Sequence, residues 1–358
     1  ELPVVYSTAS AELFATASIA LLDSLNCVDY LCFGCETDSI DLLNTVAEIL
    51  INEPKEYKDL LTLNLKTGIS FPKARAKALD EYFKKYNLDY SLDINSNNYA
   101  KYHSDITSNS NLDINTFINQ PNNILGIEYI KALMRFNSKI NPVPLKRLGA
   151  GYHSLDTRTK LASATGIRTA MANKDDISGL LPDNCLNIIK NHTTIEYNDF
   201  STVLGSKLLS MDTLDHIEGI NQDLSNRIAN NKYNFTDIET FIPMLQSKNY
   251  TYSAISRALL HIILDIKTDD IKEFISNNYV NYAMILGFNK NTGILSEINK
   301  YTKIPLVSKF ATFYKEADNN QRKMLDINLK ADNLYRMIYM NKTSETLPTE
   351  FQRQIIIK

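Results

Sequence analysis

Residues 28–40 read VDYLCFGCETDSI. The apolar run at 28–33 predicts a short buried strand that ends at Gly34. Either Asp38 or Ser39 then caps a helix over residues 40–50, because both side chains can accept a hydrogen bond from the first helical turn. Gly34 would lie at the carboxyl end of the strand, where open α/β sheets bind ligands, although a plain turn explains a glycine there equally well.

Helical patterns flank this strand on both sides. Apolar residues recur on one face over residues 9–25, and the order helix, strand, helix predicts a parallel α/β sheet. Pro72 opens another helix over residues 73–86, at a position where its missing N–H does no harm.

The next part of the chain is polar before it becomes helical again. Residues 87–118 are rich in Asn and Ser and are interpreted as a surface insertion. An apolar helix follows the sequence PNN at 121–123, and we expect Asn122 or Asn123 to be its N-cap.

Residues 139–174 differ from the rest of the chain in charge. The chain as a whole is slightly acidic, with 38 Lys and Arg against 41 Asp and Glu, whereas this stretch holds seven basic residues and one acidic residue. Within it, the sequence SATGIR at 163–168 places Ser163, Thr165 and Arg168 at a predicted helix start. Hydroxyls, free N–H groups and a guanidinium suit a polyphosphate. A basic surface helix with an ordinary Ser or Thr cap explains the same pattern.

Residues 176–358 are expected to form a mainly helical domain. Helical spacing occurs over 200–209, 214–229, 237–245 and 253–266. The sequence TDIE at 236–239 matches a capping box that runs from Thr236 to Glu239. Alternation over 279–288 predicts a strand, and the apolar residues 304–307 add a second, so we expect a small α/β tail.

Basic and aromatic residues in this second domain suggest RNA binding. Residues 285–330 hold eight Lys or Arg and four acidic residues, and tyrosines occur beside the helix at 253–266. Cations can bind phosphates while rings stack on exposed bases. Solvated lysines and core tyrosines explain the pattern without RNA. The candidate residues are Arg257, His261, Lys300, Lys303 and Lys330.

Composition excludes several other classes. No apolar run reaches the roughly 18 residues that span a membrane. Four cysteines do not make a secreted disulfide framework, so we expect a cytoplasmic protein. Cys32 and Cys35 form a C-x-x-C pair without a second ligand pair, and no metal site is predicted.

Familiar catalytic motifs are absent from the sequence. The five histidines form no H-E-x-x-H or H-x-G-H, and neither a P-loop nor G-x-S-x-G occurs. The GAG at 149–151 lacks the third glycine of a dinucleotide fingerprint, and His153 is a lone histidine in a loop. The residues alone therefore predict an α/β anion-binding domain joined to a helical domain.

Six strings together resemble one bacterial family, the tRNA(Met) cytidine acetate ligases. They are ELP at 1–3, CFGCE at 32–36, GISFPKAR at 68–75, PNNILGIEY at 121–129, RLGAGYH at 147–153 and SATGIR at 163–168. SATGIR by itself is shared with the wider HIGH-type nucleotidyltransferases. The resemblance implies a Rossmann-like HIGH-type ATP-binding domain over residues 1–175, N-terminally incomplete and interrupted at 87–118. It also implies a mainly helical tRNA-binding domain over 176–358.

This resemblance implies a two-step ligase. ATP and acetate would give acetyl-adenylate, and the acetyl group would pass to N4 of the wobble cytidine of elongator tRNA(Met), with ATP and Mg²⁺ as cofactors. Family members bind ATP with a glycine like Gly34, an asparagine like Asn122 and an arginine like Arg147; the choice of Asn122 over Asn123 rests on spacing. The remaining implied phosphate ligands are Ser163, Thr165 and Arg168.

Two departures from the family pattern matter. The family begins with a strand and a His-x-Gly-His loop, whereas this chain opens at ELP, so we expect a truncated chain that is inactive alone. Cys35 stands where a serine is common. Two alternatives therefore stay open: a non-catalytic RNA-binding scaffold with a degenerate nucleotidyltransferase fold, and another HIGH-type adenylyltransferase. The sequence makes no prediction of the oligomeric state.

Overall fold

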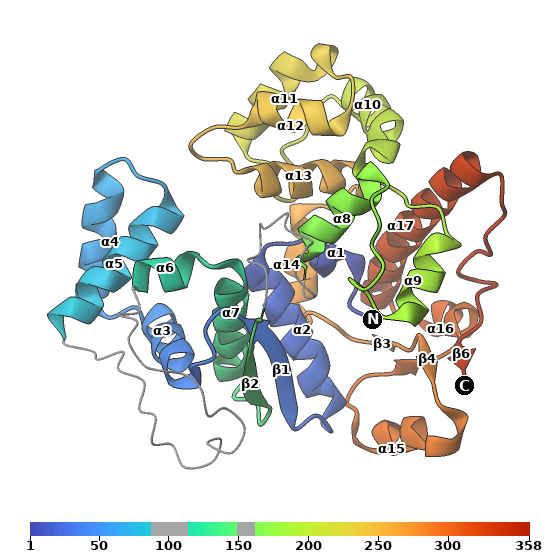
Figure 1. Ribbon diagram of the computed structural model, residues 1–358, viewed down its shortest axis with the longest axis horizontal. Helices are drawn as coiled ribbons and strands as arrows, with labels where there is room; N and C mark the ends of the chain where they lie inside the picture. Colours follow the sequence, from blue (N-terminus) through green and yellow to red (C-terminus); the bar gives the residue numbers. More distant parts are fainter. Residues whose placement is uncertain (87–113, 149–161) are drawn as a thin grey trace. The chain divides into compact units, whose positions relative to one another are not determined.

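The computed structural model describes residues 1–86, 114–148 and 162–358 (Figure 1). The chain forms two compact units. Residues Asp29–Tyr152 make the sheet unit, and Glu1–Val28 together with His153–Lys358 make the helical unit. The predicted division into domains at residues 1–175 and 176–358 stays a prediction. Most of the predicted insertion, and His153 with the GAG sequence before it, lie outside the described residues.

The sheet unit contains a pair of parallel strands. Strand β1 (Tyr30–Cys35) pairs with β2 (Asn141–Lys146), with Tyr30 opposite Asn141 and Cys35 opposite Lys146. The predicted parallel sheet is confirmed within the described residues, but the expectation that Gly34 ends the strand is wrong. Gly34 is paired with Leu145 inside the ladder, because the backbone stays extended for one more residue.

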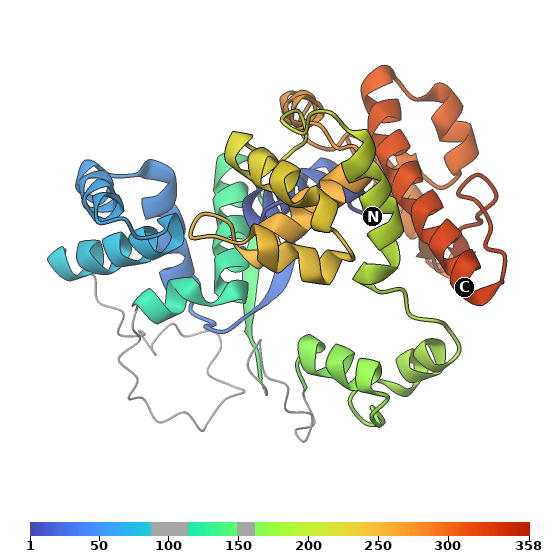
Figure 2. The same cartoon turned by 90° about the horizontal axis from the view of Figure 1, so that it is seen from above.

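Five described helices accompany these strands. They are α3 (Ile40–Asn52), α4 (Lys55–Lys66), α5 (Phe71–Lys85), α6 (Ile114–Asn119) and α7 (Pro121–Arg135). Ser39, rather than Asp38, caps α3 by accepting a hydrogen bond from the Leu42 N–H at 3.3 Å. Pro72 lies at the second position of α5, and α4 and α5 lie side by side (Figure 2).

Helix α7 packs directly on β1 because of a glycine. A Cβ atom on Gly126 would lie 2.7 Å from Cε2 of Phe33, so only a glycine allows this approach. Phe33 is buried, and its ring lies 5.6 Å from the ring of Tyr129 on the same helix. The sequence at 121–129 therefore fixes how the helix lies against the strand that carries Gly34.

The helical unit is built from the remaining described helices. They are α1 (Val4–Ser7), α2 (Ala11–Leu25), α8 (Ala164–Asn173), α9 (Asp183–Lys190), α10 (Ser201–Ser210), α11 (Gln222–Asn231), α12 (Ile238–Leu245), α13 (Tyr252–Leu264), α14 (Thr268–Ser276), α15 (Ile294–Tyr301), α16 (Phe310–Glu316) and α17 (Asn319–Thr343), with short 3₁₀ turns at Tyr197–Phe200, Lys232–Asn234 and Lys290–Thr292.

Two helix starts in this unit differ from the predictions. The helix expected over 214–229 begins only at Gln222, because Gly219 adopts φ of 81° and Asn221 then caps the helix. The capping box from Thr236 to Glu239 is wrong. Asp237 is the N-cap of α12, and its carboxylate accepts the Thr240 N–H at 3.0 Å.

The predicted α/β tail is confirmed in a reduced form. The strand expected over 279–288 is two short strands, β3 (Ala283–Met284) and β4 (Gly287–Phe288). Each has its own parallel partner, β5 (Leu306–Val307) for β3 and β6 (Ile356–Ile357) for β4.

The N-terminal residues are tied into the helical unit by burial and hydrogen bonding. Val5 and Tyr6 are fully buried in the core that α10 to α14 and α17 share. The Tyr6 hydroxyl donates to the Tyr279 carbonyl, and burial raises the pKa of Tyr6 well above its ordinary value. Among the described residues, no helix has the length and apolar character needed to cross a lipid bilayer.

Candidate functional site

The carboxyl ends of β1 and β2 bring Gly34 and Arg147 together. Arg147 follows β2, and its backbone N–H donates to the Cys35 carbonyl at 2.8 Å. Gly34 is exposed, and a Cβ built on it would lie 3.5 Å from Cγ of Arg147, which is an ordinary contact. The protein itself therefore has room for a side chain at this position. The guanidinium of Arg147 is exposed and has no ion-pair partner in the described part of the chain.

The two asparagines at the start of α7 have different roles. Neither is the N-cap, which is Gln120 without a side-chain bond, so the predicted cap is wrong. Asn123 is fully buried. Its Oδ1 accepts the N–H groups of Glu36 and Thr37 at 3.0 and 3.1 Å, and its Nδ2 donates to the Gln120 side chain at 2.7 Å. Asn123 thus locks the loop after β1 to the start of α7.

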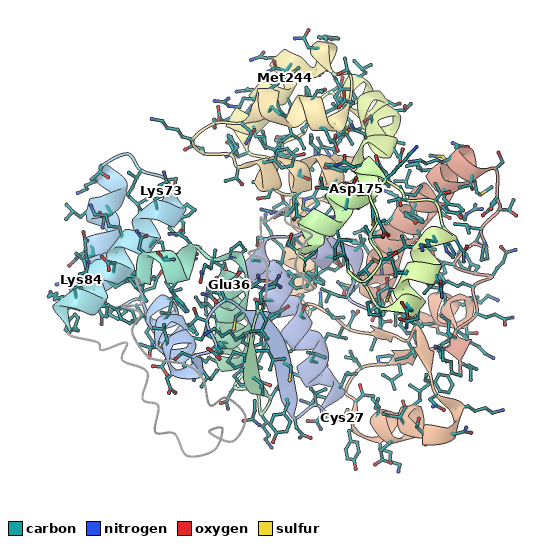
Figure 3. All side chains as sticks on the ribbon, in the orientation of Figure 1. Cys27, Glu36, Lys73, Lys84, Asp175 and Met244 are labelled. Carbon is teal, nitrogen blue, oxygen red and sulfur yellow. The ribbon has the colours of Figure 1, made fainter. Side chains whose placement is uncertain are left out.

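Asn122 is half-buried and bonds to the carboxylate of Glu36, a residue for which the sequence predicted no role. Its Nδ2 donates to Oε1 of Glu36 at 2.7 Å, and the Asn123 N–H donates to Oε2 of Glu36 at 2.9 Å. Glu36 lies directly after β1 (Figure 3). In the sequence, Glu36 was marked only by its place in the string at 32–36. Its partner Asn122 lies 86 residues further along the chain, so no local pattern could reveal the contact.

The cysteines of the C-x-x-C pair do not act together. Cys35 is buried and its thiol donates to the Thr37 carbonyl at 2.8 Å, whereas Cys32 is exposed, and both are free. Burial, with the nearby carboxylates of Asp38 and Glu36, raises the pKa of Cys35 to about 11. Cys35 is therefore a core residue whose thiol stays protonated at neutral pH.

A buried charge cluster joins two of the strings that carry the family resemblance. Lys131 and Glu128, both on α7, form an ion pair at 2.6 Å with side chains only 8% and 6% exposed. Arg75 of α5 lies 3.9 Å from the other oxygen of Glu128. The cluster links α5 to α7, and these two helices contain residues 71–75 of the first string and all of residues 121–129. Sequence periodicity gave no sign of it.

The sequence SATGIR begins α8 as predicted. Ser163 is the N-cap, and its Oγ accepts the Gly166 N–H at 2.9 Å. Thr165 is half-buried and Arg168 is exposed. These residues belong to the helical unit, whereas Gly34, Asn122 and Arg147 belong to the sheet unit. The structure therefore groups the six predicted ATP ligands as two sets of three.

The predicted tRNA-binding residues fall in different environments. His261 is 3% exposed, with its ring nitrogens bonded to the Glu218 carbonyl and to Thr8, and burial lowers its pKa. Arg257 is half-buried, and burial lowers its pKa as well. The ring of His261 is thus buried and already hydrogen-bonded within the protein, and its contact with RNA stays a prediction.

The three lysines differ in how far their charge is already paired. Lys330 donates to the Leu264 carbonyl at 2.9 Å and lies 3.8 Å from Asp265, and burial lowers its pKa. Lys300 pairs with Glu297 at 2.7 Å. Lys303 is exposed beyond the end of α15 and has no ion-pair partner among the residues described.

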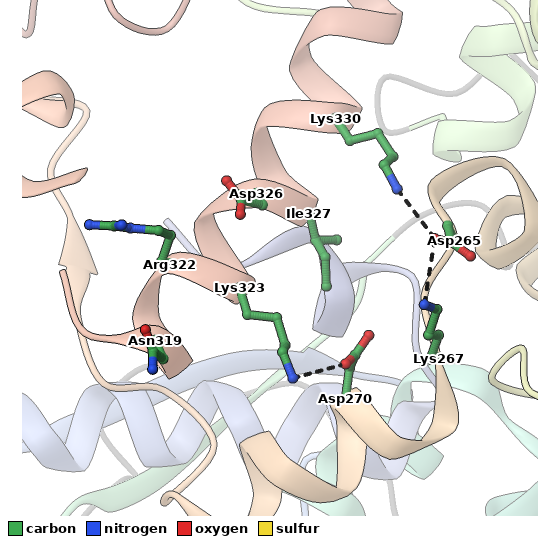
Figure 4. Close-up of a pocket in the computed structure, with 9 residues that line it drawn as sticks. All are labelled: Asp265, Lys267, Asp270, Asn319, Arg322, Lys323, Asp326, Ile327 and Lys330. Carbon is green, nitrogen blue, oxygen red and sulfur yellow. Dashed lines mark ion pairs between the residues drawn. The ribbon is translucent and has the colours of Figure 1, made fainter. Parts of the chain in front are cut away.

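A surface pocket beside Lys330 is lined by both signs of charge (Figure 4). Lys323 pairs with Asp270 at 3.3 Å, and Asp265 lies between Lys267 and Lys330. Four cations line this pocket against three carboxylates, and Arg322 donates to backbone carbonyls, so the excess of positive charge is small. The described ranges also contain no cluster of three or more His, Cys, Asp or Glu that could hold a metal ion.

Comparison with known proteins identifies the class to which this fold and these strings belong. Residues 1–350 match the family model described as HIGH Nucleotidyl Transferase. The predicted fold class, a HIGH-type α/β nucleotidyltransferase with a helical domain, is confirmed.

Individual relatives narrow the class to one family. The tRNA(Met) cytidine acetate ligase of Halothermothrix orenii is 32% identical over 354 residues, which cover 95% of this chain and 79% of that protein. The protein of the same name from a Thermoanaerobacter species is 34% identical, with 96% and 80% covered. The chain belongs to the tRNA(Met) cytidine acetate ligase family.

Solved structures agree with this assignment. The apo crystal structure of Thermotoga maritima TmcAL matches with a TM-score of 0.84 at 26% identity, and the match covers 100% of this chain and 83% of that chain. The same protein bound with alpha-thio ATP matches equally well.

Proposed function

We propose that this protein activates acetate with ATP and transfers the acetyl group to N4 of the wobble cytidine of elongator tRNA(Met) in the cytoplasm. The observation that carries this proposal is the identity of 32–34% over 94–96% of the chain to proteins named for that reaction. The ATP-analogue complex of Thermotoga maritima TmcAL supports ATP as the nucleotide.

The chemistry requires activation of a carboxylate. Acetate is a poor acyl donor until one oxygen becomes a good leaving group, and AMP supplies that group. The enzyme then contributes positioning and neutralisation of phosphate charge. In the proposal Gly34, Asn122 and Arg147 bind ATP, and the exposed guanidinium of Arg147 is available for this because no acidic side chain pairs with it in the described segments.

The start of α8 is the second proposed ATP-binding element. Ser163 shapes the first turn, and Thr165 and Arg168 contact phosphates, the arginine by charge-assisted hydrogen bonds. Mg²⁺ usually binds through substrate phosphates and one or two carboxylates. The described side chains include no cluster of metal ligands. We therefore propose that the ATP phosphates supply most of the ligands of the Mg²⁺ ion.

The tRNA is proposed to bind the helical unit near α15. Lys303 and Lys300 are exposed there beside Tyr301, which is 49% exposed and can stack on a base. Lys330 and Arg257 are secondary candidates, because both are partly buried and Lys330 is already hydrogen-bonded.

The test uses the full-length gene product. We expect acetate-dependent exchange of pyrophosphate into ATP, followed by acetylation of elongator tRNA(Met). Arg168→Ala should slow the exchange at least tenfold, in line with the roughly 1.5–3 kcal/mol of a hydrogen bond to a charged group. Lys190→Ala, an exposed lysine on α9, is the matched control.

Two outcomes separate the candidate functions, and a third tests whether α8 belongs to the ATP site. Exchange driven by another carboxylate, and not by acetate, would favour a different adenylyltransferase. Salt-dependent tRNA binding without any exchange would favour the non-catalytic scaffold. Acetate-dependent exchange that Arg168→Ala leaves unchanged would remove α8 from the ATP site.

A further inference from the structure

The carboxylate of Glu36 occupies the N-terminus of α7. Its Oε2 accepts the Asn123 N–H at 2.9 Å, and its Oε1 accepts the Asn122 N–H at 3.4 Å. A negative charge at a helix N-terminus is favourable, and it satisfies N–H groups that would otherwise lack partners. A second anion at the same place would be repelled. A phosphate is therefore disfavoured at this helix start, and a nucleotide that contacts Asn122 would do so with an uncharged part.

The same carboxylate sets the direction of the Asn122 side chain. Oε1 of Glu36 lies 2.7 Å from Nδ2 of Asn122. An ionised carboxylate only accepts hydrogen bonds, so the amide must turn its NH₂ group toward Glu36. Oδ1 of Asn122 then points elsewhere. It accepts no hydrogen bond in the described part of the protein, and the residue is half-exposed.

Glu36 itself is held from both sides. Its backbone N–H donates to the buried Asn123 side chain at 3.0 Å, while its carboxylate bonds to the start of α7. Gly34 lies two residues earlier in β1, on the exposed strand face. The acceptor on Asn122, a residue of α7, is thus oriented by the short loop that follows the proposed nucleotide-binding strand.

We propose that Glu36 is a positioning residue that presents Oδ1 of Asn122 as an acceptor for a donor on the uncharged part of ATP. That donor is either the 6-amino group of adenine or a ribose hydroxyl. This inference rests on the proposed function, because it deepens the ATP site described there.

Binding of ATP analogues to the wild-type protein identifies which group of ATP donates to Asn122. Inosine triphosphate carries an oxygen in place of the 6-amino group, and 2′-deoxy-ATP and 3′-deoxy-ATP each lack one ribose hydroxyl. A site built around an acceptor rejects an analogue that lacks the donor. We expect one of these analogues to bind at least about tenfold more weakly than ATP by calorimetry. Equal binding of all four nucleotides would overturn the inference.

Glu36→Gln tests the positioning role. The new amide has one acceptor oxygen instead of two, so Asn122 and Asn123 can no longer each bond to an oxygen of their own. We expect the KM for ATP to rise about tenfold, with kcat changed much less, and the preference for ATP over the discriminated analogue to shrink. Glu48→Gln on α3 is the matched control, because Glu48 is exposed and its carboxylate has no partner within the described ranges. A loss of stability with an unchanged nucleotide preference would show a merely structural role and refute the proposal.

A reciprocal exchange adds a rescue. In Asn122→Asp alone, the new carboxylate would lie next to the carboxylate of Glu36, and their repulsion should weaken ATP binding. Combined with Glu36→Gln, the new glutamine can donate to the new aspartate, which still offers an acceptor on its other side. We expect the double variant to bind ATP more tightly than Asn122→Asp, and no recovery would count against the contact.

These measurements separate this inference from the proposed function. ATP binding with the expected discrimination, but without acetate-dependent exchange, would support the inference and refute the acetate ligase. Acetate-dependent exchange with no discrimination would do the reverse. No ATP binding by the full-length protein would refute both.

Discussion

Replacing Gly34 with alanine should separate folding from nucleotide binding. A new Cβ would lie 3.5 Å from Cγ of Arg147, an ordinary van der Waals distance, and apart from the chain neighbours of Gly34 no other atom of the described residues lies within 4 Å. A glycine inside a strand costs roughly 0.5–1 kcal/mol relative to alanine, because its backbone loses more freedom on folding. The free energy of unfolding of Gly34→Ala should therefore stay equal to that of the wild type or rise by up to about 1 kcal/mol.

Binding should change in the opposite direction. If ATP approaches the strand at Gly34, the added methyl overlaps with it, and overpacking of this kind costs about 1–3 kcal/mol. That range corresponds to ATP binding about 5–150-fold weaker. The assay pairs urea unfolding with calorimetric titration of ATP on the same preparation.

Gly126→Ala is the matched control for this reasoning. Its Cβ would lie 2.7 Å from the buried Phe33 ring, so overpacking should exceed the gain of about 1 kcal/mol in helix propensity, and the protein should lose stability. Two glycine-to-alanine changes in one unit thus have opposite expected effects on unfolding. Wild-type affinity for ATP in Gly34→Ala would show that the nucleotide does not approach here. A large loss of stability in Gly34→Ala would show that the strand face at Gly34 has no room for a methyl group.

Three further changes test other parts of the structure. Glu128→Gln should lower the free energy of unfolding by about 1–3 kcal/mol in urea titrations, because Lys131 and Arg75 both lose the buried carboxylate that they face; a loss below about 0.5 kcal/mol would contradict this. Lys303→Glu should weaken tRNA binding, and the slope of the logarithm of the binding constant against the logarithm of salt concentration should become about one unit less steep. Lys272→Glu on α14 should change neither quantity. Iodoacetamide at pH 8 should modify Cys32 but not Cys35, whose pKa near 11 keeps its thiol protonated until the pH approaches that value; mass spectrometry of the peptides decides.

Local sequence patterns predicted the elements that depend on neighbours along the chain. The N-cap at Ser163 and the helix after Ser39 follow from side chains three residues from the N–H groups they bind. Strand β1 follows from its apolar run. Where two local rules competed, the prediction failed. Asp237 rather than Thr236 caps α12, since the aspartate carboxylate reaches the Thr240 N–H.

Contacts between distant residues could not be predicted in this way. Strand β2 contains Pro142 and Pro144, which weaken a strand pattern in the sequence. Both prolines are compatible with an edge strand whose alternate N–H groups face away from β1, and only the pairing of residues 30–35 with 141–146 makes this visible. The burial of His261 is equally hidden, because a histidine on a helix looks the same whether it is buried or exposed.

The start of α7 shows how such a distant contact changes a functional assignment. Sequence rules gave an asparagine there a capping role, since asparagine is a favoured N-cap. Instead, the carboxylate of Glu36 accepts the N–H groups at the start of the helix. The amide of Asn122 does not cap the helix, and its hydrogen bond to Glu36 fixes its orientation. Arg147 has the opposite character, because it is an exposed cation that pairs with no acidic side chain among the residues described. An acceptor oriented by a carboxylate and an exposed guanidinium suit different parts of one nucleotide, the uncharged nucleoside and the charged phosphates. The nucleotide analogues test this division of roles.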